Sequence, residues 1–111
     1  MNRYITDGLV RDAAAGKNIV IVAKTLYHAE CELRLAIEAA PNSWTRTSAA
    51  NGNKYAEHLS GGTIRPVAAT ASLRGRDPDV LLVLDFRDMD ERQQAEVTPF
   101  IHMRTEVLLN S

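Results

Sequence analysis

Three stretches of the sequence contain only apolar residues, with neither the period of an amphipathic helix nor the alternation of a half-buried strand. They lie at residues 19–23, 80–84 and 107–109. Short continuous apolar runs are typical of strands covered on both faces, as in a parallel sheet. We therefore predict buried strands at about 18–24, 80–85 and 106–110.

Helical patterns lie on both sides of the first predicted strand. The first helix has an apolar stripe made of Ile5, Leu9 and Ala13. Gly16 stands where the glycine after a helix is favoured. Thr25 can cap a second helix, over about 26–40, on whose polar side Glu30 and Arg34 are spaced to pair. The stripe of this second helix contains Ala29, Leu33, Ala36, Ile37 and Ala40.

The segment after residue 85 predicts further helix. Asp88 and Glu91 resemble a capping box, with Asp in place of the usual Ser or Thr. This predicts a helix that ends near Val97. Thr98 and Pro99 then have the character of a new N-cap and first helical residue. They predict a second short helix, which would contain Phe100, Ile101 and Met103.

Residues 44–70 have a different character, because they combine strand residues with turn signals. Residues 44–48 have strand composition, and Asn51-Gly52 is a strong turn signal. Residues 60–62, Ser-Gly-Gly, predict a hairpin loop. Pro66 cannot donate a ladder hydrogen bond, so its strand should be an edge or be bulged there. We predict an antiparallel hairpin insert over about 53–69. The fold class is therefore α/β, a three-layer sandwich with a short parallel sheet and flanking helices.

Composition restricts the class of protein. The chain has 111 residues, 45% of them hydrophobic and 24% charged, with a formal net charge of −1. These values predict one globular domain and no global basic field for nucleic acid. Cys31 is the single cysteine, so no internal disulfide can form, which fits a reducing compartment. No apolar run is long enough to span a membrane and no signal peptide is seen, so we expect a cytoplasmic protein with no membrane partner.

Polar residues end each of the three predicted strands. They are Lys24-Thr25, Asp85 and Asn110-Ser111. In open α/β sheets, ligands bind outside the carboxyl ends of the strands, which makes Asp85 a candidate ligand of Mg²⁺ or water. A capping or turn role explains an Asp at this place equally well.

Taken in order, these segments resemble the RecA-like ATPase core of phage terminase large subunits and, more distantly, of superfamily 2 helicases. Residues 21–26 look like the family's strand that ends in Ala-Pro-Thr, and residues 59–64 look like its glycine-containing hairpin. Leu73-Arg74-Gly75 and the strand ending at Asp85 resemble the Arg-Gly segment and the Walker B strand. Residues 88–111 are similar to its acidic, proline-containing helix and following strand. The resemblance implies a single truncated RecA-like domain over residues 1–111.

The sequence departs from this family at the groups that handle ATP. The phosphate loop G-x-x-x-x-G-K-[ST] is absent. Gly16-Lys17 precedes a strand instead of opening a helix, so we interpret it as a helix end. The family's catalytic Glu is Phe86 here, which leaves only Asp85 as a remnant of the nucleotide and metal site. Because phosphoryl transfer needs both positioning and charge stabilisation, we expect a non-catalytic protein with no cofactor.

Other candidate sites are weaker. The acidic residues Asp85, Asp88, Asp90 and Glu91 could supply oxygen ligands to a cation, but helix capping explains most of them and we predict no metal site. His28 and Cys31 lie one helical turn apart, although a cysteine in a helix is usually a small apolar filler. The resemblance also implies a nucleic-acid surface, which would contain Lys24, Thr25, Arg74 and Arg76.

Two classes of function follow. The first is a non-catalytic, phage-encoded interaction module, acting in the host cytoplasm, that binds a protein partner or itself. In the family, the phosphate-loop strand lies beside the strand that matches residues 106–110. We therefore expect Val107, Leu108 and Leu109 to form an exposed apolar edge. With the first helix, this edge would form the interface of a homo-oligomer or complex. The alternative is a nucleic-acid-binding accessory protein, or residual nucleotide binding at Asp85.

Overall fold

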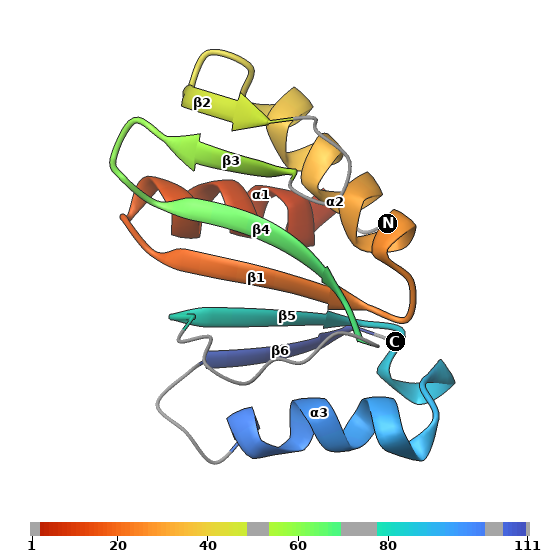
Figure 1. Ribbon diagram of the computed structural model, residues 1–111. Coiled ribbons are helices and arrows are strands. Elements are labelled where there is room, and N and C mark those ends of the chain that lie inside the picture. The colour runs from red at the N-terminus through yellow and green to blue at the C-terminus, as the bar shows by residue number, and fades with distance from the viewer. Residues whose placement is uncertain (1–2, 49–53, 70–77, 102–105, 111) are drawn as a thin grey trace.

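The three apolar runs form neighbouring parallel strands of one mixed sheet. They are β1 (Asn18–Ala23), β5 (Val80–Leu84) and β6 (Glu106–Asn110), which confirms the three predicted strands. The structure is a computed structural model and describes residues 3–48, 54–69, 78–101 and 106–110. The described sheet has six strands in the order β2-β3-β4-β1-β5-β6 (Figure 1).

The other three strands extend the sheet on the far side of β1. They are β2 (Trp44–Ser48), β3 (Tyr55–His58) and β4 (Thr63–Ala68). β3 and β4 pair antiparallel, as predicted, but β4 also pairs in parallel with β1 over its whole length. The hairpin is therefore part of the main sheet and not an insert beside it. The prediction of an edge or a bulge at Pro66 was wrong, because β4 lies between β3 and β1 and keeps an unbroken register with β1. The β3 pairing reaches only to Ile64, so it requires no hydrogen bond from Pro66, which has no backbone N–H to donate.

Helices cover the two faces of the sheet, which gives the predicted three-layer α/β arrangement. α1 (Arg3–Ala14) and α2 (Leu26–Ala39) lie on one face, and α3 (Glu91–Ile101) lies on the other beside β5 and β6 (Figure 1). Alternate residues of β1 and β5 enter the two cores. The α1–α2 core takes Ile19, Ile21, Ala23, Val80, Leu82 and Leu84. The α3 core takes Val20, Val22, Leu81 and Val83, with Met89 and Val97.

Local sequence signals explain where the first two helices begin and end. α1 ends before Gly16, whose φ of 83° is the left-handed conformation expected after a helix. Thr25 caps α2 by accepting a hydrogen bond from the His28 N–H at 3.3 Å. The predicted Glu30–Arg34 pair is replaced by an ion pair between Glu30 and Lys54 at 3.5 Å. Among the described residues, no helix is both long and apolar enough to cross a bilayer.

The predictions for α3 were wrong in two details. The capping box begins at Asp90, not Asp88: the Gln93 N–H donates to Asp90 Oδ1 at 2.8 Å, and the Asp90 N–H donates to Gln93 Oε1 at 3.1 Å. The helix then continues through Thr98 and Pro99 instead of restarting there. Pro99 has no N–H and so removes one intrahelical bond, and α3 ends two residues later, at Ile101. Of the predicted second helix, Met103 lies outside the described residues.

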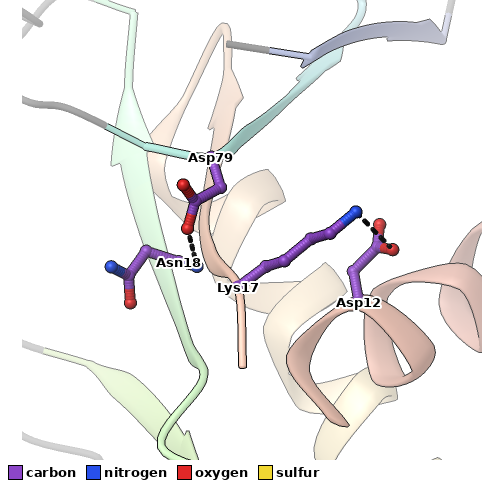
Figure 2. A network of polar contacts seen from close by, with 4 residues as sticks. All are labelled: Asp12, Lys17, Asn18 and Asp79. Atoms are coloured by element: carbon purple, nitrogen blue, oxygen red, sulfur yellow. Dashed lines mark hydrogen bonds and ion pairs between the residues drawn. The ribbon is translucent and has the colours of Figure 1, made fainter. Parts of the chain in front are cut away.

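Two reciprocal hydrogen bonds join the amino ends of β1 and β5. The Asn18 N–H donates to Asp79 Oδ2 at 2.9 Å, and the Asp79 N–H donates to the Asn18 carbonyl at 2.8 Å. Figure 2 shows the Asp79 carboxylate directed at the Asn18 backbone, with the Lys17–Asp12 ion pair beside it. The contact fixes the register of the two central strands.

The turn between β3 and β4 packs against the end of α1. The Ser60 hydroxyl donates to the Ala13 carbonyl at 2.6 Å and accepts from the Gly62 N–H at 3.3 Å. Gly62 is buried, and a Cβ built on it would lie 2.1 Å from the Ala13 carbonyl oxygen. Only glycine allows this approach of the two backbones.

We expect Gly62→Ala to lower the free energy of unfolding by about 1–3 kcal/mol, because the new methyl group must push α1 and the turn apart. The matched control is Gly8→Ala within α1, where an added Cβ meets nothing within 4 Å. That substitution should raise stability by about 0.5–1 kcal/mol through helix propensity. Urea denaturation of both variants checks the pair, and equal effects would contradict the proposed clash.

Candidate functional site

The predicted site residues Lys24, Thr25 and Asp85 lie at the carboxyl ends of two neighbouring strands. Lys24 and Thr25 follow β1 directly and lead into α2. Asp85 lies between β5 and the short 3₁₀ helix η1 (Phe86–Asp88). Because β1 and β5 are parallel and adjacent, the polar residues that follow them meet at one edge of the sheet.

Asp85 has an unusual backbone conformation. Its φ of 57° and ψ of 33° lie in the left-handed region, and among the described residues it alone adopts a positive φ without being glycine. Asp tolerates this region better than most residues. The Asp88 N–H donates to the Asp85 carbonyl at 2.9 Å, which closes the turn. The Asp85 side chain makes no capping hydrogen bond to η1, so the capping alternative does not describe its contacts.

The Asp85 carboxylate instead contacts a histidine. The Nδ1 atom of His28 lies against Asp85 Oδ2, and both side chains are partly exposed. His28 is in the first turn of α2, where the Thr25 cap fixes the backbone. The sequence suggested only Cys31 as a partner of His28, and the contact with Asp85 was not predicted. The available signal was the βα connection, which places the first turn of a helix near the end of a neighbouring parallel strand.

A buried acid lies on the same side of α2 as His28. Glu32 is one helical turn beyond His28, and its side chain is only 1% exposed. The Thr6 hydroxyl of α1 donates to Glu32 Oε1 at 3.2 Å. Burial raises the pKa of Glu32, and the Thr6 hydrogen bond and the charge of His28 offset this in part. The sequence did not predict the burial of Glu32, because its neighbours on α2 form an apolar stripe that is typical of a hydrophobic core.

The arrangement pairs the His28 imidazole with one carboxylate, that of Asp85, and places a second, Glu32, one turn further along α2. A carboxylate on Nδ1 orients the ring and leaves Nε2 as its other proton-carrying atom. General-base catalysis would also need a nucleophile or bound water within hydrogen-bond distance. Among the described residues, no hydroxyl or thiol contacts the His28 ring, and the Thr25 hydroxyl contacts only the His28 backbone. The described geometry is therefore that of a histidine held against a carboxylate, and the nearby Thr25 hydroxyl serves as the cap of α2.

The remaining predicted residues are distributed differently. Lys24 is exposed at the same edge of the sheet, whereas Arg74 and Arg76 lie outside the described residues. Within the described part of the chain, no group of three His, Cys, Asp or Glu side chains could hold a metal ion. Of the acidic cluster, Asp90 serves as a helix cap and Asp85 pairs with His28. Cys31 lies at a separate cavity and not with His28 at Asp85.

Comparisons with protein-family models, with curated proteins and with solved structures found no match to this chain.

The raised pKa of Glu32 allows a prediction of how the free energy of unfolding depends on pH. Because its native pKa is raised, the native state keeps a proton that the unfolded chain releases near the ordinary value of 4.5. Between the two pKa values the native state binds more protons, so this group's contribution to stability falls as pH rises. Glu32→Gln removes the titration and keeps an acceptor for Thr6. Its stability relative to the wild type should therefore increase as pH rises.

Urea denaturation at several values between about pH 4 and pH 8 measures this difference. The matched control is Glu38→Gln, an exposed position on the same helix. A Glu32→Gln advantage that shrinks as pH rises, or that Glu38→Gln reproduces, would show that the buried carboxyl is not its source.

Proposed function

We propose that this chain is a non-catalytic α/β interaction module that binds a protein partner, or a second copy of itself, through strand β6. The observation that carries the proposal is the position of β6 at the end of the sheet. It pairs with β5 over all five of its residues, from Glu106 to Asn110. Among the described strands, none lies on its other side.

An open strand edge presents unpaired backbone N–H and C=O groups, which pair readily with another strand. Natural edges are usually protected by charges, prolines or bulges. β6 has the sequence Glu-Val-Leu-Leu-Asn, with Glu106 as its one charge and no proline. Val107 packs against the core on the α3 side, which anchors the strand. α1 packs over β1, β3 and β4, so we assign the interface to β6 rather than to β6 and α1 together.

Three observations support a non-catalytic role. The sequence has no phosphate loop. The Asp85 carboxylate is already paired with His28. Phe86, where the resembling family has its catalytic Glu, packs against the α3 core. The neighbouring order β1-β5-β6 leaves open the edge where that family's phosphate-loop strand would lie, which supports descent from a terminase-like core. On this proposal the protein is phage-encoded and acts in the cytoplasm.

We expect no ATP hydrolysis and no ATP binding tighter than about millimolar, because neither a phosphate cradle nor a catalytic base is available. Phosphate release and isothermal titration calorimetry with Mg²⁺ and ATP measure these two properties. Asp85→Asn is the informative variant, since it removes the one carboxylate that the resemblance identifies. Mg²⁺-dependent turnover that this variant abolishes would contradict the proposal.

We expect the protein to sediment as a dimer at about 100 μM, or to be monomeric alone and dimeric with a cognate strand. Leu108→Lys should abolish the association, because it introduces a charge into the proposed interface strand. The matched control is Leu59→Lys, at a residue that is 65% exposed in the β3–β4 turn. It should leave the association unchanged.

Analytical ultracentrifugation of the three proteins, with circular dichroism as a check of folding, distinguishes the outcomes. A wild-type monomer whose Leu108→Lys variant is equally soluble and equally stable would exclude β6 as an interface. Equal loss of association in both variants would place the interface elsewhere.

A further inference from the structure

A cavity lies beside α2, and His28 is not among the residues that line it. The cavity has a volume of about 190 Å³ and lies between α2, the end of β2 and the start of β3. The residues that line it include Leu33, Ile37, Cys31 and Tyr27. Tyr27 is 75% exposed although it is a large aromatic residue. The cavity is thus mainly apolar and open on one side.

Three of the residues that line the cavity are charged, and one of them, a cation, has no partner among the described residues. Lys54 and Glu30 form an ion pair at 3.5 Å and so offset each other. Arg34 also lines the cavity, and it forms no ion pair with any described residue. A guanidinium binds a carboxylate through two parallel hydrogen bonds, which makes an anionic group the complement of this rim.

The volume restricts the size of the ligand. A buried apolar cavity of about 150 Å³ holds one benzene molecule. Sites for drug-sized ligands measure roughly 300–1,000 Å³. At about 190 Å³, this cavity has room for a single ring with a short arm. We propose that it binds a small organic carboxylate with one aromatic or similar apolar ring, the ring against Leu33 and Ile37 and the carboxylate on Arg34.

This cavity is separate from the proposed β6 interface, because it includes the end of β2, whereas β6 lies at the opposite end of the described sheet. Cys31 supplies a reporter, because it is the only cysteine in the sequence and it lines the cavity. The probe is phenylacetate, and the readout is the rate at which a maleimide labels Cys31 at constant pH. Amide chemical shifts of Leu33 and Ile37 give a second, label-free readout.

We expect phenylacetate to slow the labelling of Cys31 in a saturable manner and to shift the two amide signals. Arg34→Gln should weaken this binding by about threefold or more, the range expected for a partly exposed ion pair. The matched control is Arg11→Gln, which removes one exposed positive charge from α1 and should leave the affinity unchanged. Benzyl alcohol, which has the ring but no carboxylate, should bind more weakly than phenylacetate.

Three results would overturn the proposal. One is the absence of protection and of shifts up to about 10 mM phenylacetate, a concentration that detects even weak affinity. Another is equal protection by phenylacetate, benzyl alcohol and phenethylamine, which would show that the carboxylate is not recognised. The third is equal weakening by Arg34→Gln and Arg11→Gln, which would indicate a general charge effect. Circular dichroism of both variants excludes unfolding as the cause.

Discussion

The rest of the structure depends on the pairing of β1 with β5. Every residue of β5 and all but the first of β1 are buried. Strands buried on both faces require helices on both faces, which determines the three layers. Parallel strands also bring their carboxyl ends together. The Asn18–Asp79 contact holds the amino ends in register, so that Asp85 reaches the first turn of α2.

The polar groups at this edge satisfy one another. Asp85 contacts His28, the Thr25 hydroxyl accepts from the His28 backbone, and Glu32 accepts from Thr6. A divalent cation at Asp85 would have to displace the imidazole and leave His28 beside the cation's charge. The electrostatics of this edge thus favour a stable helix–strand junction over a metal centre, even though the position in the sheet is the one where ligands usually bind.

The sequence predicted those parts of the fold that depend on local pattern. The apolar runs, the Thr25 cap and the Gly16 helix end carry short-range signals, and each was found as expected. Contacts that depend on tertiary geometry were not predictable in this way. Glu30 pairs with Lys54 and not with Arg34 on its own helix, and the Asp85 side chain contacts His28 and not its own backbone. Both partners come from distant segments of the chain, so local pattern could not indicate them. The left-handed conformation of Asp85 has no signal of its own in the sequence.

The two edges of the sheet differ in a way that bears on association. β2, at one edge, carries the exposed residues Thr45, Arg46 and Thr47, and its pairing with β3 shifts register between Trp44 and Arg46. Charge and irregularity of this kind protect an edge against further pairing. β6, at the other edge, keeps an unbroken register with β5 and has an apolar centre. A regular strand can add another strand at little cost in distortion, whereas an irregular one cannot. On the proposal that the chain associates by strand addition, β6 is therefore favoured over β2, and a symmetric dimer would use a single pair of edges.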